Sequence, residues 1–145
     1  MMTGMENCVF CGIVSGHVPG TKVAEDDLTL TFMDINPAAD GHMLVIPKFH
    51  SEDLLEIDAE DLTAVTLSAQ RVAKAAMSEL GADGVNLLNC CKAPAWQTVF
   101  HFHLHVIPRY ADKTKDRLTL PWRPGIGERP AVLAELGARL RSGLN

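Results

Sequence analysis

The chain has 145 residues, of which 47% are hydrophobic, and a net charge of −5. This length and composition are typical of one globular domain with room for a core. The acidic balance and the absence of any long Lys/Arg cluster disfavour binding to polymeric nucleic acid, which depends on neutralising phosphates. No apolar run approaches the about 18 residues of a membrane span, and residues 1–7 do not resemble a signal peptide. We therefore expect no membrane contact and a cytoplasmic location.

Strand and helix patterns follow one another along the chain without an internal repeat. In chain order we expect a loose tail at 1–6, a short helix at 8–16, hairpin strands at 22–25 and 28–33, a strand at 41–47, a short helix at 51–57, a long helix at 58–80, strands at 84–90 and 98–109, and a last helix from Pro130 within a C-terminal extension at 111–145. Asp58 suits the N-cap of the long helix, and Gly81 suits its end. This order predicts a single α+β domain over residues 1–145 with a mainly antiparallel sheet.

Half of the six histidines fall within the segment 98–109, where they alternate with apolar residues. The period of two is typical of a half-buried strand with Phe100, Phe102, Leu104 and Val106 facing a core. The Cα atoms of His101 and His105 would lie about 13 Å apart on a straight strand. One metal ion cannot bind all three imidazoles at that spacing, so we expect the three histidines to have different roles.

The pair Cys8 and Cys11 forms a second candidate site near the start of the chain. A C-x-x-C pair is compatible with redox chemistry, with a metal site or with two small buried side chains. A zinc site would need two further ligands, and His50 and His101 are candidates. Cys90 and Cys91 are adjacent and are expected to be small residues at a strand end.

Three further observations bear on the chemistry. A neutral imidazole is a good nucleophile toward phosphorus, and histidines near their ordinary pKa of about 6.5 could also stabilise phosphate charge as imidazolium. Asp34, at the end of an apolar strand, could bind a vicinal diol or simply start a turn. A metal-dependent hydrolase stays open as an alternative, although no carboxylate lies within six residues of the histidine row.

The segment from His101 to Ile107 resembles the His-φ-His-φ-His-φ-φ motif of the histidine triad (HIT) family, where φ is apolar. Further matches are Cys8 to Val14, Phe32 to Pro37, Gly41 to Lys48, Gln97 to Val99, and Pro108-Arg109. The resemblance covers nearly the whole chain. It implies the HIT-like α+β fold, a homodimer formed through the long helix and a shared strand, and hydrolysis at the α-phosphate of a nucleoside phosphoramidate or dinucleoside polyphosphate.

The resemblance also implies residue roles. His103 would be the nucleophile that forms a nucleotidyl-histidine intermediate, and His105 would contact the phosphate with help from Gln97 and Thr98. Asp34 would hold the ribose. The remaining nucleotide contacts would come from Phe10, Ile13, Phe32, Ile35 and Asn89, and a structural zinc ion would be bound by Cys8, Cys11, His50 and His101. The substrate would be a purine nucleotide with an AMP-like product.

Two positions depart from the family pattern. Cys90 stands where the family often has Asn or Gln, and Trp96 stands where a Gly is common. Because both lie beside the expected phosphate site, they motivate an alternative function, a catalytically weak nucleotide-binding protein with a structural zinc ion.

Overall fold

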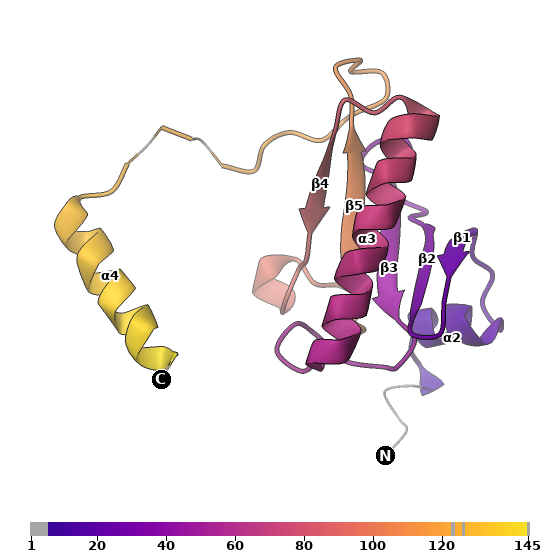
Figure 1. Ribbon diagram of the computed structural model, residues 1–145, viewed down its shortest axis with the longest axis horizontal. Coiled ribbons are helices and arrows are strands. Elements are labelled where there is room, and N and C mark those ends of the chain that lie inside the picture. The colour runs from indigo at the N-terminus through magenta and orange to yellow at the C-terminus, as the bar shows by residue number, and fades with distance from the viewer. Residues whose placement is uncertain (1–5, 123, 126, 145) are drawn as a thin grey trace.

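The computed structural model describes residues 6–122, 124–125 and 127–144 (Figure 1). Its centre is a five-stranded sheet in the order β1-β2-β3-β5-β4, in which every neighbouring pair is antiparallel. The strands are β1 (Lys22–Glu25), β2 (Thr29–Met33), β3 (Met43–Pro47), β4 (Gly84–Leu88) and β5 (Leu104–Arg109). The predicted α+β fold with an antiparallel sheet is confirmed.

The strand β3 lies in the middle of the sheet and is buried along its whole length. Met43 and Val45 pack in the core on one face of the sheet, and Leu44 and Ile46 pack in a second core on the other. Successive side chains of a strand point to opposite faces, so an unbroken apolar run is what a strand between two cores requires.

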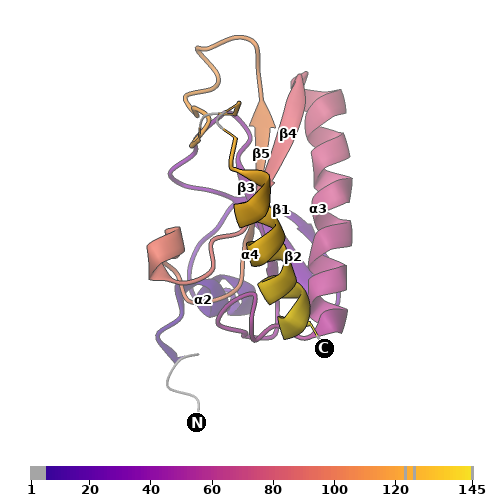
Figure 2. The ribbon, with the colours of Figure 1, turned by 90° about the vertical axis from the view of Figure 1, so that its left-hand side faces the viewer.

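The helix α3 (Ala59–Leu80) covers one face of the sheet (Figures 1 and 2). The Asp58 carboxylate accepts a hydrogen bond from the N–H of Asp61 (2.9 Å), and Gly81 ends the helix at φ +67°. Both predicted caps are confirmed, and loss of the Asp58 cap would cost about 1 kcal/mol. The apolar side of α3 is buried through Val65, Ala69, Val72 and Ala76.

The short helix α2 (Val9–Ser15) lies on the opposite side of the sheet (Figure 2). Its buried residues Phe10 and Ile13 pack against Phe32 and Leu44. Gly16, at φ +86°, ends the helix as predicted, because glycine adopts this left-handed conformation without strain. This second core forms one wall of the pocket described below.

Some predicted elements are shorter than expected. Residues 51–57 form turns rather than a helix, because the Asp53 carboxylate accepts hydrogen bonds from the N–H groups of Leu55 and Glu56. The strand β4 ends before Asn89, and β5 begins only at Leu104. Upstream of β5 the chain leaves the sheet ladder, and Phe100, expected in the core, is 46% exposed.

The C-terminal helix α4 (Pro130–Gly143) begins at Pro130, as predicted. Its predicted apolar row does not pack on the rest of the chain, since none of its residues is buried. Figure 1 shows α4 standing apart, on the side of the sheet where β4 is the edge strand. Among the described residues, no helix combines the length and apolarity needed to cross a membrane.

Candidate active site and metal centre

The three histidines of the motif are divided between two neighbouring sites, as their spacing predicted. His101 is fully buried beside α2, whereas His103 and His105 line a pocket on the same face of the sheet. The unpaired stretch before β5 runs beside the segment that follows β3, where the N–H of Phe102 donates to the carbonyl of Ser51 (2.7 Å). This placement separates the metal-facing histidine from the pocket-facing pair.

The candidate metal centre combines Cys8, Cys11, His50 and His101, the four ligands that the sequence predicted. Cys8 is the N-cap residue of α2, and its sulfur accepts a hydrogen bond from the N–H of Cys11 (3.4 Å). The first turn of the helix therefore turns both thiols to the same side. Burial, together with the neighbouring Cys8, raises the pKa of Cys11 to about 12, so a pair of thiolates at this place requires a cation beside it.

The donor atoms of this cluster fit a tetrahedral zinc ion. The Nδ1 of His101 lies 3.4 Å from the sulfur of Cys8, 3.5 Å from that of Cys11 and 3.1 Å from the Nδ1 of His50. Zinc–sulfur bonds of about 2.3 Å and zinc–nitrogen bonds of about 2.0–2.1 Å, at tetrahedral angles, place such donors about 3.3–3.7 Å apart.

The protonation of His101 also suits a metal ligand. Its Nε2 lies 2.8 Å from the carbonyl oxygen of Pro47, which can only accept a hydrogen bond. The proton of the neutral ring is therefore on Nε2, and the lone pair of Nδ1 faces the two sulfurs. A backbone carbonyl that fixes the tautomer of a ligand histidine is a common feature of metal sites.

His103 has the opposite arrangement of its ring nitrogens. Its Nδ1 donates to the carbonyl of His101 (2.8 Å), which leaves an unprotonated Nε2 on the neutral ring. Burial lowers the pKa of His103, so the ring is neutral at pH 7. The residue lines the pocket and packs edge-on against Phe10. This geometry provides a nucleophilic nitrogen at the pocket wall.

His105 is held in its tautomer by a short chain of hydrogen bonds. The N–H of Ala38 donates to the Nδ1 of His42 (3.0 Å), so the proton of the His42 ring is on Nε2. That Nε2 donates to the Nδ1 of His105 (2.9 Å). The remaining proton of His105 is therefore on its own Nε2, where it can be donated to a ligand.

The charge state of His105 differs from the expectation. Burial, with smaller effects of His103 and His42, lowers the pKa of His105 to about 4. The ring is thus neutral at pH 7, and it would stabilise phosphate charge through an N–H donor rather than as imidazolium.

Asp34, His42 and His105 form a second group with metal-ligand side chains. The Oδ2 of Asp34 lies 3.4 Å from the Nε2 of His42 and 3.9 Å from the Nδ1 of His105. A metal ion on the Nε2 of His42 would displace the ring proton to Nδ1, where it would meet the N–H of Ala38. Two donors would then face each other, so this group serves as a hydrogen-bond chain rather than a metal site.

The pocket has a volume of about 360 Å³, and two kinds of residue line it. The apolar lining residues are Val9, Phe10, Ile13, Val18, Pro19, Gly20, Phe32, Met33, Ile35, Leu44 and Val99, and the polar ones are Asp34, Asn36, Thr98, His103 and His105. The predicted site residues Phe10, Ile13, Phe32, Ile35, Asp34, Thr98, His103 and His105 are therefore brought together. A mainly apolar pocket that also presents neutral imidazoles and a carboxylate can hold a base, a sugar and a phosphate group.

Two predicted nucleotide contacts do not lie on the pocket wall. The Gln97 amide donates to the carbonyls of Glu52 (2.8 Å) and Val99 (3.1 Å) and accepts from the N–H of Lys92 (2.7 Å). Asn89 donates to the carbonyl of His103 (2.9 Å). The Gln97 amide is thus occupied at both ends and the Asn89 nitrogen by one carbonyl, and neither residue lines the pocket, so their predicted contact with the nucleotide stays a prediction.

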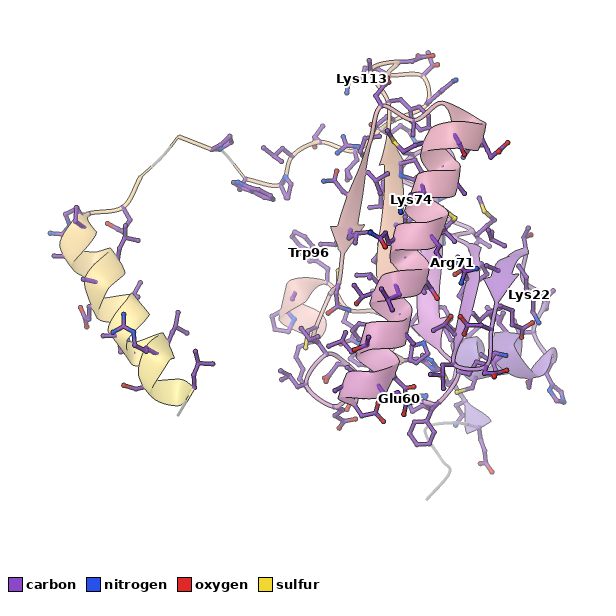
Figure 3. The ribbon with its side chains drawn as sticks, in the orientation of Figure 1. Lys22, Glu60, Arg71, Lys74, Trp96 and Lys113 are labelled. Atoms are coloured by element: carbon purple, nitrogen blue, oxygen red, sulfur yellow. The ribbon has the colours of Figure 1, made fainter. Side chains whose placement is uncertain are left out.

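The two positions that depart from the family pattern also lie off the pocket wall. Trp96 is 65% exposed and projects from the loop after β4 (Figure 3), and Cys90 is buried. Trp96 has φ +73°, a left-handed conformation that favours glycine, which explains why a glycine is common there. Their placement gives no support to the expectation that Trp96 and Cys90 weaken catalysis from beside the phosphate site.

Sequence reasoning assigns no function to His42. The pattern around it is compatible with a buried histidine bonded to backbone, and its Nδ1 does accept a backbone N–H. The bond from its Nε2 to His105 was not predicted. A polar ring at the entry of an otherwise apolar central strand could have indicated such a bond, because a buried histidine needs partners on both nitrogens.

A model of the HIT domain family matches residues 15–112 of the chain. This chain belongs to the HIT family. Among its relatives, "Protein hit" of Bacillus subtilis is 43% identical over 105 residues, which are 72% of each chain. A protein named "Adenylylsulfatase HINT3" from Arabidopsis thaliana is 39% identical over 107 residues, 74% of this chain and 54% of that protein.

Solved structures of HIT proteins agree with the fold. A HIT family protein from Bacillus anthracis is 35% identical and superposes with a TM-score of 0.87, covering 97% of this chain and 99% of that chain. A zinc-bound histidine triad family protein from Mycobacterium smegmatis is 40% identical, with a TM-score of 0.73 over 93% of this chain and 99% of that one. The HIT fold of this chain is thus shared with known members.

Proposed function

We propose that this HIT protein is a nucleotide hydrolase that acts at the α-phosphate of a nucleoside phosphoramidate or a dinucleoside polyphosphate. The observation that carries the proposal is the unprotonated Nε2 of His103 in the wall of a pocket whose lining is mostly apolar. Only a neutral imidazole with a free lone pair can attack phosphorus, and burial lowers the pKa of this ring so that it is neutral at pH 7.

The reaction would proceed in two displacements at phosphorus. In the first, the Nε2 of His103 forms a bond to the α-phosphorus, and the bond to the leaving group breaks. The leaving group keeps the electron pair and takes a proton from water. In the second, a water molecule attacks the same phosphorus, the phosphorus–nitrogen bond breaks with its electron pair returning to Nε2, and a nucleoside monophosphate leaves with neutral His103 restored. The proton that the attacking water loses neutralises the hydroxide left by the first step.

The other residues of the pocket would bind and orient the nucleotide. The Nε2–H of His105 and the hydroxyl of Thr98 are donors for phosphate oxygens, and Asp34 can accept hydrogen bonds from the ribose hydroxyls. The apolar lining residues suit a purine base. The adenylyl chemistry in the name of the Arabidopsis relative supports an AMP-like product.

We also propose a structural zinc ion bound by Cys8, Cys11, His50 and His101. The separations of the donors and the tautomer of His101 support it, as does the zinc-bound M. smegmatis neighbour. Because all four ligands come from the protein, the site is closed and takes no part in the reaction. Bound zinc would tie α2 to the rest of the chain.

Turnover of adenosine 5′-phosphoramidate, followed as AMP release, tests the hydrolase. We expect His103→Ala to lower kcat by about a thousandfold or more, because it removes the attacking nitrogen. The control is His17→Ala, which removes an exposed histidine bonded to Ser15, and it should keep wild-type turnover. Rapid quenching of the wild type should yield a nucleotidyl-protein detectable by mass spectrometry. Turnover that survives His103→Ala would remove the nucleophile assignment.

The alternative, a catalytically weak nucleotide-binding protein, is an outcome of the same experiment. Its motivation is the pair Trp96 and Cys90, and neither residue lines the pocket. Tight AMP binding without AMP release by the wild type would support it. The cytoplasmic location stays a prediction.

We further propose a homodimer in which each C-terminal helix packs on the second copy. The residues Leu133, Leu136 and Leu140 form an apolar row on α4 that is 45–73% exposed. A lone helix of this length is marginally stable in water, so α4 requires a partner surface. The edge strand β4 exposes Leu87 and Leu88, and α4 stands beyond that edge with space between them (Figure 1).

Light scattering after size exclusion tests this arrangement. We expect the full chain to elute with twice its monomer mass and the double variant Leu136→Glu/Leu140→Glu to shift toward the monomer. The control Ala138→Glu places one such charge at an exposed position off the apolar row. A monomeric wild type would remove the proposal, and a double variant that remains fully dimeric would remove the role of α4.

A further inference from the structure

The loop between β4 and the histidine segment contains two strained residues. Lys92 has φ +78° and ψ +155°, a region that is essentially restricted to glycine, and Trp96 is left-handed at φ +73°. Between them lies the short 3-10 helix η1 (Ala93–Ala95). A lysine in such a conformation persists only where surrounding contacts hold it there.

Those contacts come from residues 51–53, which we call the clasp. The carbonyl of Ser51 accepts from the N–H of Phe102 (2.7 Å). The carbonyl of Glu52 accepts from the Gln97 amide (2.8 Å), and the Oδ2 of Asp53 lies 2.6 Å from the Nζ of Lys92. Three consecutive residues thus hold both the loop and the segment that carries His101 and His103.

The Lys92–Asp53 ion pair is asymmetric in burial. The Asp53 side chain is fully buried, whereas that of Lys92 is half exposed. The Oδ1 of Asp53 accepts hydrogen bonds from two backbone N–H groups, and its Oδ2 forms the ion pair with the ammonium of Lys92. Lys92 also holds the pKa of Asp53 below its usual range. A buried carboxylate is stable only with such partners, so the pair fixes the position of the loop relative to the clasp.

The loop in turn is connected to the pocket wall. Besides Glu52, the Gln97 amide binds the carbonyl of Val99, and its oxygen accepts from the N–H of Lys92. Thr98 and Val99, the next two residues, line the pocket. A displacement of Lys92 would therefore move Gln97 and, through it, Thr98 and Val99 on the pocket wall.

We infer that Lys92, Asp53 and Gln97 are positioning residues that align Thr98 and His103 with the phosphate, an assignment that rests on the proposed hydrolase. None of the three lines the pocket. A glycine at position 92 would relieve the backbone strain, but it would also remove the ion pair that connects the loop to the clasp.

Substitutions at Lys92 separate the ion pair from the backbone conformation. Lys92→Met keeps the length of the side chain and removes its charge, Lys92→Gly relieves the strain and also removes the charge, and Lys92→Arg keeps the charge. We expect kcat for adenosine 5′-phosphoramidate to fall about tenfold in Lys92→Met and Lys92→Gly, with largely retained activity in Lys92→Arg, because small misplacements of reacting groups are costly. The matched control is Lys74→Met on α3 (Figure 3), where the same change should leave kcat unaltered.

The double variant Lys92→Met/Asp53→Asn provides a second test. Asparagine needs no cation, so the double variant should regain part of the melting temperature lost in Lys92→Met while its kcat stays low. Such a split is not expected of a residue that acts on stability alone. Wild-type kcat in both Lys92→Met and Lys92→Gly would overturn the inference. Full activity of Lys92→Gly alone would show that the backbone conformation, and not the ion pair, aligns the pocket residues, which would also overturn it.

Hydrogen exchange distinguishes a failure of this inference from a failure of the proposed hydrolase. If the wild type releases no AMP, the kinetic comparison is void, but the clasp still predicts faster amide exchange of residues 91–99 in Lys92→Met than in Lys74→Met. Equal exchange in the two variants would remove the clasp itself.

Discussion

Two groups of metal-ligand side chains lie a few residues apart along the histidine segment, and they differ in where their ring protons are held. In the group of Cys8, Cys11, His50 and His101, a carbonyl takes the Nε2–H of His101, and the free lone pair faces the sulfurs. In the group of Asp34, His42 and His105, a backbone N–H occupies the lone pair of His42, and a proton lies between the two rings. The difference indicates that one backbone partner can suit a histidine either to bind metal or to donate a hydrogen bond.

The largest expected effect comes from removing a ligand of the first group. We expect His50→Ala to lose nearly all zinc on dialysis, since a closed site depends on four ligands. His42→Ala, the same change in the second group, should keep one zinc per chain by elemental analysis. Zinc loss in His42→Ala, or a second zinc equivalent in the wild type, would break the distinction between the groups.

The hydrogen-bond chain is tested by activity. His42→Ala removes the donor to the Nδ1 of His105, so its tautomer is no longer fixed and the donor to the phosphate is lost in part of the molecules. We expect kcat to fall about tenfold to a hundredfold. His42→Gln, which offers an amide N–H, should recover part of the loss in the same assay. Equal activity of His42→Ala and the wild type would show that the chain is not needed.

The pH dependence of turnover is expected to report the buried rings. Burial lowers the pKa of His103, and that of His105 to about 4, below the ordinary value of 6.5. Both rings therefore stay neutral below pH 6.5, and kcat/KM should decline only below that pH, as the proposed catalytic histidines take up protons. A midpoint at or above the ordinary histidine value would contradict this.

Stability should follow the same direction. In the unfolded chain the histidines take up protons near pH 6.5, whereas buried His105 stays neutral to about pH 4. The unfolded state thus binds more protons between these values, and the free energy of unfolding should decrease as the pH falls through this window. Urea denaturation at pH 7 and pH 5 measures the change.

The smallest expected effect concerns the base. Apart from the residues proposed to contact the phosphate and the ribose, Asn36 is the one polar residue that lines the pocket, so few side chains could recognise the edge of a base. We expect adenosine and guanosine phosphoramidates to differ by about threefold or less in kcat/KM, since apolar pockets discriminate weakly between similar shapes. A difference of about a hundredfold would indicate a specific contact to the base.

Much of this architecture follows from local sequence patterns. The caps of α3 depend on Asp58 and Gly81, and the unbroken apolar run of β3 fixes the middle of the sheet, so both were predictable. The four metal-ligand residues were assigned through the family resemblance, and the structure brings them together. The tautomers were not predictable, because they depend on carbonyl and N–H groups from distant segments, such as Pro47 and Ala38.

The partners of Gln97 could not be predicted for the same reason. Its amide is bound by Glu52, which lies 45 positions away along the chain. The exposed row on α4 shows another limit, since an amphipathic pattern predicts that a face is buried but not which chain covers it.

The short helix α2 has a consequence for how the two sites communicate. Cys8 and Cys11 face the metal centre, while Phe10 and Ile13, on the same two turns, form the apolar wall of the pocket. A bound zinc ion would therefore anchor the apolar wall against which the proposed base would lie. By thermodynamic linkage, any gain in nucleotide affinity caused by zinc must appear as an equal gain in zinc affinity caused by nucleotide. Zinc release to a chelator should slow in the presence of AMP. The nucleotide affinity of this protein would then depend on the supply of zinc, even though the metal takes no part in the proposed reaction.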